Sequence, residues 1–208
     1  MSNPQTPLRP ENCFHVYNHA VGHENLFPAD KDYAYFLKKI IQHVVPVSDI
    51  LSFCLMPNHF HLVIRIKNPD ETENFFRLKT GTEKYESQKS KNENYLEQQI
   101  SKCYSNLFNT YAKYYNFHYN RTGTLFKRTF RRKKIDDLGY LKRLICYVHQ
   151  NPVVAGFIDK PELWRYSSYA ALLSSMPTLI PREEIIGLFE DLENLKFCHA
   201  RLEEIKID

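Results

Sequence analysis

The stretch MPNHFHLVIRIK, from Met56 to Lys67, decides how this chain is interpreted. It predicts a β-strand in which His59 and His61 point to one face, because successive strand side chains alternate between the two faces. The other face of the same strand is wholly apolar and carries Phe60, Leu62 and Ile64. One face therefore belongs to a hydrophobic core, whereas the two imidazoles on the opposite face need another explanation.

The surrounding residues predict the elements that accompany this strand. Ile50 to Leu55 is β-prone, and the turn formers in MPNH indicate an antiparallel hairpin with Phe60 to Ile66. A further strand is expected over Phe14 to Val21, and another near the end of Thr124 to Ile135. Three helices are expected, over Asp30 to about Val45, Tyr95 to about Phe117, and Asp136 or Asp137 to about Asn151, where Pro152 should end the last.

This order, β-α-β-β-α-β-α, predicts an α+β fold. We expect a ferredoxin-like, or RRM-like, antiparallel sheet with helices packed on one face. The length of 208 residues fits one domain. Its core is expected over about residues 13–173, with a polar insertion over about 68–94 and an acidic helical tail over about 178–208.

The five cysteines indicate the compartment. Their number is odd and no two form a C-x-x-C, which argues against a disulfide framework and a zinc ribbon. Free thiols in a reducing, cytoplasmic setting are the simplest interpretation. The first ten residues lack the apolar segment of a signal peptide, and no apolar run approaches the roughly 20 residues that span a bilayer. No membrane association is therefore expected.

Positive charge is concentrated in one part of the chain. The formal net charge is only +4, but the segment Arg121 to Tyr147 holds nine Lys and Arg against two Asp. Such a block is typical of a protein that binds a polyanion, and also of a solvated surface with counter-charges folded over it. The residues that we expect to contact nucleic acid are Arg121, Lys127, Arg128, Arg131, Arg132, Lys133, Lys134 and Arg143.

The two histidines can bind one divalent cation together. Same-face neighbours on a strand have Cβ atoms about 6–7 Å apart, and a pair of imidazoles needs a third ligand from elsewhere. The helix that ends near Asn151 offers one. At 100° per residue, Tyr147 and Asn151 lie beside each other on the flank of its apolar stripe, with Arg143 one turn before Tyr147.

A phenol, an amide, a guanidinium and two imidazoles suit a phosphodiester. The phenol of Tyr147 would attack phosphorus, the cation would polarise the phosphate, and Arg143 would favour the ionised phenol. The competing interpretation is that Tyr147 is one of fourteen ordinary tyrosines, with its hydroxyl in water. The tyrosines of the preceding helix rank lower as nucleophiles, because none has an amide four residues later: Tyr111, Tyr114 and Tyr115.

Four blocks in this order resemble a known family. MPNHFHLVI, NRTGTLFKRTFRRKKI, YVHQNPVVAGF and WRYSSY are similar to the single-tyrosine HUH transposases, and within them to the REP-associated tyrosine transposases. The resemblance covers roughly Phe14 to Leu173; the polar insertion and the residues after about Ser174 depart from the compact members.

The resemblance implies a specific activity. The metal that this family uses would be Mg²⁺ or Mn²⁺, held here by His59, His61 and Asn151. The nucleophile would be Tyr147. The family cuts single-stranded DNA beside a folded hairpin, leaving a 5′-phosphotyrosine and a free 3′-OH that can join another strand. The catalytic set is then Tyr147, His59 and His61.

Other functions and assemblies stay open on the sequence alone. The first alternative is a domesticated hairpin-DNA-binding protein or regulator with little or no strand-transfer activity. The second is a metal-dependent hydrolase that uses water and leaves no protein–DNA adduct. Both a monomer and a homodimer are compatible with the resemblance.

Overall fold

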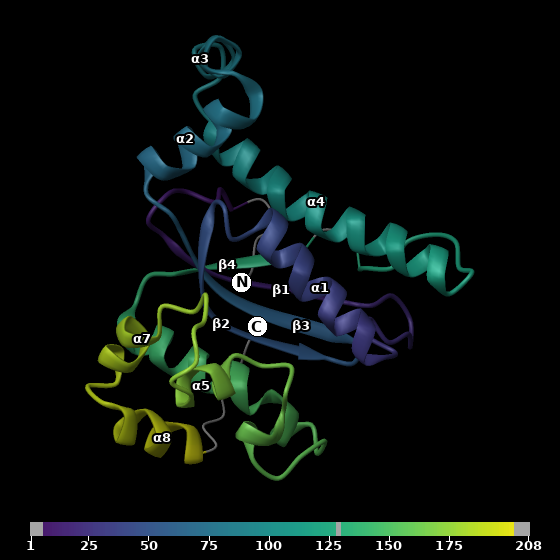
Figure 1. Cartoon of the computed structure of the whole chain (residues 1–208), viewed down its shortest axis with the longest axis vertical. Coiled ribbons are helices and arrows are strands. Elements are labelled where there is room, and N and C mark those ends of the chain that lie inside the picture. The colour runs from purple at the N-terminus through teal and green to yellow at the C-terminus, as the bar shows by residue number, and fades with distance from the viewer. Residues whose placement is uncertain (1–5, 128–129, 202–208) are drawn as a thin grey trace.

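The centre of the molecule is a four-stranded antiparallel sheet. The computed structural model describes residues 6–127 and 130–201. The strand order is β2-β3-β1-β4, and each neighbouring pair is antiparallel (Figure 1). The strands are β1 (Cys13–His19), β2 (Ser48–Met56), β3 (His59–Ile66) and β4 (Arg131–Ile135). The predicted α+β class and the predicted β2–β3 hairpin are therefore confirmed.

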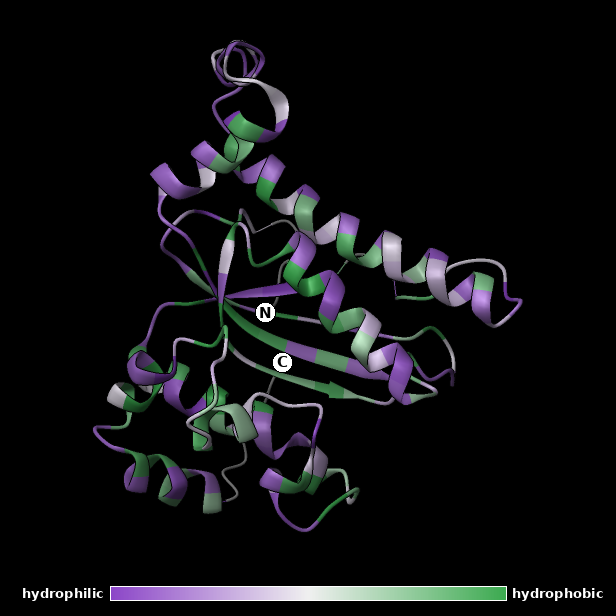
Figure 2. Ribbon diagram, in the orientation of Figure 1, coloured by the Kyte–Doolittle hydropathy of each residue, from purple (hydrophilic) through white to green (hydrophobic). Residues whose placement is uncertain are grey.

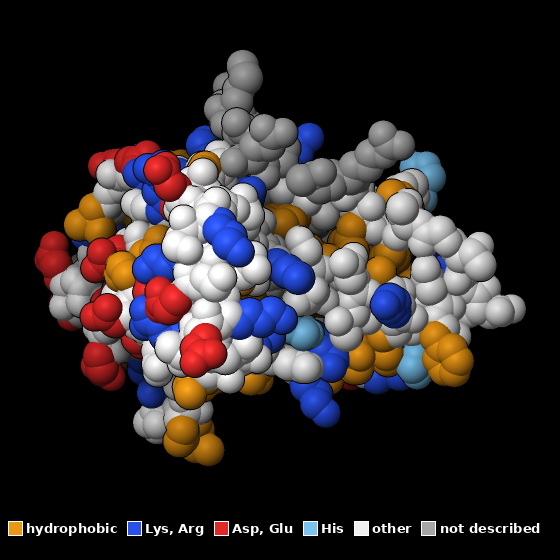
Figure 3. Space-filling model, turned by 90° about the horizontal axis from the view of Figure 1, so that it is seen from above, with side chains coloured by type: hydrophobic (Ala, Val, Ile, Leu, Met, Phe, Trp, Pro, Cys, Tyr) orange, Lys and Arg blue, Asp and Glu red, His pale blue; other side chains and the backbone are white. Residues whose placement is uncertain are grey.

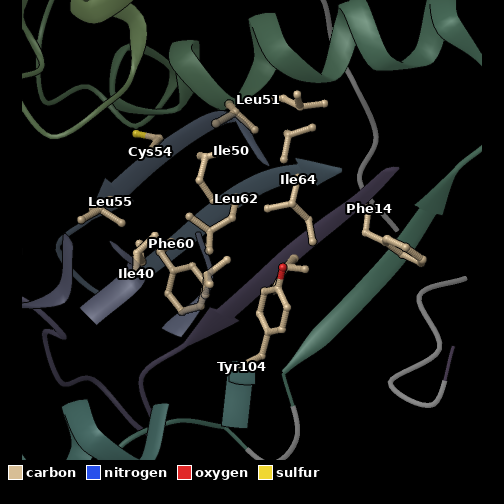
Figure 4. Close-up of a cluster of buried hydrophobic side chains, with 14 of the residues drawn as sticks. Phe14, Ile40, Ile50, Leu51, Cys54, Leu55, Phe60, Leu62, Ile64 and Tyr104 are labelled. Atoms are coloured by element: carbon tan, nitrogen blue, oxygen red, sulfur yellow. The ribbon is translucent and has the colours of Figure 1, made fainter. Parts of the chain in front are cut away.

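One face of the sheet forms the main hydrophobic core. Phe14 lies beside Ile64, and Val16 lies beside Leu62, with all four side chains buried. The helices α1 (Asp30–His43) and α4 (Tyr95–His118) pack against each other and cover this face. Figure 4 shows Phe60 and Tyr104 on one side of the sheet and Leu51 and Cys54 on the other.

The helix α5 (Leu138–Val154) covers the opposite face. It begins at Asp137, whose side chain accepts a hydrogen bond from the backbone N–H of Tyr140. The helices therefore lie on both faces, which differs from the expectation of one face. The reason is that α5 has its own apolar stripe to bury, with Leu144 and Val148 fully inaccessible, and the core face is already occupied.

Pro152 does not end α5, contrary to the expectation from sequence. The helix continues to Val154, and the carbonyl of Asn151 still accepts the N–H of Ala155. Proline removes one N–H from the helical hydrogen bonds, and because Pro152 lies in the last turn only two helical residues follow it. The chain then reverses at Gly156, whose φ of 73° suits glycine.

The polar segment 68–94 forms a helical pair at one end of the molecule. It contains α2 (Pro69–Thr80) and α3 (Thr82–Lys89), and α3 is largely hydrophilic (Figures 1 and 2). Phe76 and Tyr85 are buried between these helices and α4. Arg77 pairs with Glu73 and Glu86 at 2.7 Å. The segment is therefore helical, with a small core of its own.

The C-terminal part packs around α5. It comprises η1 (Pro161–Leu163), α6 (Tyr169–Leu173), α7 (Arg182–Leu188) and α8 (Leu192–Ala200). Acidic side chains gather at the left edge of Figure 3, the side on which Figure 1 places α7 and α8. The five cysteines are free thiols. Among the described residues, no helix is both long and apolar enough to cross a bilayer.

Candidate functional site

The strand β3 presents His59 and His61 together, as its alternation predicts. Their ring centroids are 5.1 Å apart and the rings are nearly perpendicular. The Nδ1 of His59 lies 2.7 Å from Oδ1 of Asn58, so its Nε2 is directed elsewhere. His61 is only 5% exposed, and its Nδ1 lies 2.9 Å from Nε2 of His15. Both histidines therefore keep one ring nitrogen, Nε2, for the space between the sheet and α5.

The helix α5 brings Tyr147 and Asn151 to these histidines. The Oδ1 of Asn151 lies 3.5 Å from Nε2 of His59. The ring of Tyr147 meets that of His61 edge to face, with centroids 5.8 Å apart. The Nδ2 of Asn151 donates to the carbonyl of Tyr147, one turn earlier, which directs Oδ1 toward His59. The four residues grouped by sequence reasoning thus meet across the gap.

The strand β1 contributes side chains that sequence reasoning missed. His15, Tyr17 and His19 alternate with the core residues of β1 and lie beside Val63, His61 and His59 in the register. The ring of His19 stacks on that of His59 at 4.7 Å. The alternation in FHVYNH carries this signal, but recognising it requires knowing that β1 pairs with β3.

Burial controls the charge of these imidazoles. Loss of hydration lowers the pKa of His59 to about 4, assisted by the neighbouring His19. Burial likewise lowers the pKa of His15 to about 3 and holds the pKa of His61 well below its usual value. All three rings are therefore neutral at pH 7, which is the form that coordinates metal ions.

The donor set could hold a divalent cation. Adjacent ligand atoms on an octahedral ion with bonds of about 2.1 Å lie about 3 Å apart, close to the 3.5 Å between His59 Nε2 and Asn151 Oδ1. Two imidazoles and one amide oxygen leave further positions for water and phosphate oxygens. Among the described residues, no group of three or more His, Cys, Asp or Glu side chains is placed so that it could hold a metal ion by itself.

The basic block is divided between the two faces of the sheet. Arg131 and Lys133 lie beside Tyr17 and His15 in the β1–β4 register, so they border the histidines. Arg132 lies on the core face, where it is 8% exposed and donates to Oγ of Ser101 at 3.0 Å. Its burial lowers the pKa of its guanidinium.

The remaining basic residues have different surroundings. Arg121 is tied to Glu24 at 2.7 Å and to nearby loop carbonyls. Lys127 is exposed near His19, Lys134 pairs with Asp136, and Arg143 lies 4.0 Å from Asp137 at the start of α5. Arg143 is thus directed toward Asp137. Arg128 lies outside the described residues.

The rival tyrosines on α4 have hydrogen bonds on the core side. Tyr111 donates to the carbonyl of Leu26, and Tyr115 donates to that of Asn25 at 2.9 Å. Tyr114 donates to the buried carboxylate of Asp32 at 3.1 Å. Their hydroxyls therefore anchor α4 to the segment that leads into α1.

The fold and the paired histidines define an RRM-like α+β protein with a polar site between sheet and helix. The structure is similar to that of a REP-associated tyrosine transposase bound to a REP hairpin, with a TM-score of 0.53 and 11% identity. The match covers 86% of this chain and 90% of the other. The resemblance inferred from the sequence is thereby confirmed for the fold. No protein-family profile matches the sequence, and neither does any curated protein.

Proposed function

We propose that this protein is a metal-dependent single-strand DNA endonuclease and strand transferase that cuts beside DNA hairpins. The observation that carries the proposal is the meeting of β3 and α5. Two neutral imidazoles, an amide oxygen and a phenol converge from elements far apart in sequence. The similar transposase structure contains a hairpin, which supports DNA as the substrate class.

The chain's own residues account for each part of the reaction. The phenol oxygen of Tyr147 attacks phosphorus, and the bond from phosphorus to the 3′-oxygen breaks. The phenol loses its proton to solvent, and the leaving oxygen gains one to become a free 3′-OH. His59, His61 and Asn151 would hold Mg²⁺ or Mn²⁺, which supplies charge stabilisation at the phosphate. The 5′-phosphotyrosine then reacts with a 3′-OH from another strand in the reverse sense.

The placement of the basic residues narrows the DNA contacts that we propose. Lys127, Arg131 and Lys133 lie at or beside the histidine face, and Lys134 and Arg143 lie near the start of α5. Arg121 and Arg132 have structural partners in this conformation. We therefore assign phosphate binding chiefly to the first three residues, with Arg128 adjoining them in sequence.

The nucleophile is tested by Tyr147→Phe, with Tyr114→Phe as the matched control. Labelled hairpin DNA with a single-stranded flank is incubated with Mn²⁺ and each variant, and adducts are resolved on a denaturing gel. Tyr147→Phe keeps the ring volume, so we expect binding close to that of the parent, with no adduct and no cleavage. Tyr114→Phe should form the adduct.

The other outcomes separate the competing functions. An adduct from Tyr147→Phe would show that the nucleophile is wrongly assigned. Cleavage without an adduct in the parent would favour the water-using hydrolase. Tight hairpin binding by the parent, without cleavage in any divalent metal, would favour the domesticated binding protein or regulator.

The ligand set is tested by metal binding rather than by activity. We expect Asn151→Leu to lower Mn²⁺ affinity by at least tenfold in calorimetric titrations, and Asn151→Asp to retain an oxygen ligand. His61→Ala is a poorer test of the ligand set. His61 is buried and bonded to His15, so its removal leaves a cavity as well as a missing ligand.

A further inference from the structure

We propose that His15 is a positioning residue for the metal site, because it supplies the acceptor for the Nδ1 proton of His61. This inference rests on the proposed function, since it concerns how His61 presents Nε2 to the cation.

The geometry of the pair is well defined. The Nε2 of His15 lies 2.9 Å from Nδ1 of His61, with ring centroids 5.1 Å apart and ring planes within 19°. His15 is fully buried and stacks on Tyr17 at 4.6 Å. Both histidines stand on central, paired strands, so the contact is held by the register of β1 and β3.

Only one direction of this hydrogen bond is compatible with metal binding. A neutral imidazole carries one proton, and a coordinating nitrogen must have none. When Nε2 of His61 binds the cation, its proton is on Nδ1 and is donated to Nε2 of His15. The single proton of His15 is then on Nδ1. A hydrogen-bond acceptor behind a coordinating histidine is a general device that fixes its tautomer and ring orientation.

The other end of His15 suggests that the pair changes state on metal binding. Its buried Nδ1 has no hydrogen-bond partner among residues 6–127 and 130–201. An unpaired buried N–H costs more than an unpaired lone pair, so the metal-free pair favours the reverse direction. In that direction Nε2 of His15 donates its proton to Nδ1 of His61, and the single proton of His61 is on Nε2. Binding moves one proton on each ring from Nε2 to Nδ1 through water, without net proton release.

His19 provides a comparison on the same strand. It stacks on His59 at 4.7 Å with ring planes within 18°, and His59 obtains its Nδ1 partner from Asn58 instead. Replacing the ring of His19 with another aromatic ring retains this stacking. The two histidines of β1 therefore have separable roles, ring packing for His19 and proton acceptance for His15.

The test combines metal affinity with the tautomer of His61. Mn²⁺ affinity is measured calorimetrically for the parent, His15→Phe, His15→Gln and His19→Phe. Long-range ¹⁵N–¹H NMR gives the protonated nitrogen of His61 with and without diamagnetic Mg²⁺. We expect His15→Phe, which keeps a ring but lacks an acceptor, to bind Mn²⁺ about 10–100-fold more weakly. His15→Gln should recover part of the loss, and His19→Phe should stay near the parent.

The spectroscopic result distinguishes positioning from general packing. In the parent, the proton of His61 should move from Nε2 to Nδ1 when Mg²⁺ is added. Unchanged Mn²⁺ affinity in His15→Phe, or a tautomer of His61 that does not respond to Mg²⁺, would overturn the inference. If His15→Phe does not fold, equal losses in His15→Gln and His19→Phe would overturn it. A parent that binds neither metal would instead contradict the metal site of the proposed function.

Discussion

The two faces of the sheet are built from the same strands, but one is packed mainly with apolar side chains and the other with polar ones. On the core face, Phe60 packs against Phe36 with ring centroids 5.2 Å apart, and the buried hydroxyl of Tyr104 bonds to Ser48 at 2.7 Å. On the face under α5, buried imidazoles contact one another, and Nδ1 of His15 has no hydrogen-bond partner in the described part of the chain. The first arrangement maximises apolar burial, whereas the second keeps polar atoms in place.

This difference shows where the protein accepts a cost in stability. Burying a polar group without a partner costs free energy, and Nδ1 of His15 is such a group among the described residues of the site face. The core face has α1 and α4 packed over it, so its stability supports the histidine face on the same strands. Disrupting either face should therefore have distinct consequences for stability and for activity.

The largest effect on stability is expected from the core face. Phe60→Ala removes a fully buried ring that contacts Phe36 and Phe108, and should lower the free energy of unfolding by about 3–5 kcal/mol. His59→Ala, the preceding residue on the half-buried site face, should cost about 1 kcal/mol. Urea denaturation monitored by circular dichroism gives both values. If both variants lose the same free energy of unfolding, the two faces contribute equally to stability.

A smaller effect should appear on acidification, through His199 behind α5. Burial lowers the pKa of His199 to about 4, so the folded state stays neutral while the unfolded chain takes up a proton near pH 6.5. Its contribution is present above pH 6.5 and is lost as the pH falls toward 4. Between pH 7.5 and 5.5 this amounts to roughly 1.4 kcal/mol.

The comparison variant for this pH dependence is His199→Gln. Urea midpoints at the two pH values give the change in unfolding free energy for each protein. The variant should lose less stability than the parent on acidification, whatever its stability at pH 7.5. A parallel pH dependence would contradict the role of His199.

The smallest effect should distinguish neighbouring cations on β4. Replacing Arg131 and Lys133 with alanine should reduce the slope of log affinity against log salt by about 0.7–0.9 for each lost phosphate contact. Arg132→Leu lies between them but faces the core, so its slope should match that of the parent. Fluorescence anisotropy with hairpin DNA at several salt concentrations measures this. If only Arg132→Leu lowers the slope, the phosphate contacts belong to the core face of β4 and not to the histidine face.

Local periodicity was sufficient to predict which polar side chains of β3 and α5 lie together. The alternation of β3 placed His59 and His61 together, and the helical wheel placed Asn151 near Tyr147; the structure brings all four together. These signals succeed because each depends on one element whose geometry is regular. The resemblance to the REP-associated tyrosine transposases is supported by the fold.

Features that depend on pairing between distant segments were not predicted. His15 and His19 reach the site only through the register of β1 with β3, which joins residues 40 or more positions apart. The position of α5 on the second face depends on α1 and α4 having filled the first. The burial of Arg132 follows from alternation along a strand whose start could not be located in a basic loop.

The edges of the sheet affect how copies of this protein can meet. The free edge of β2 is covered by the segment after η1, since Leu55 bonds to Tyr166 and Ser168 bonds to Phe53. The other edge is β4, which is short and presents alternating cations on both faces, a combination that discourages strand addition and aggregation. A homodimer of this chain would therefore associate through its helices rather than by extending the sheet.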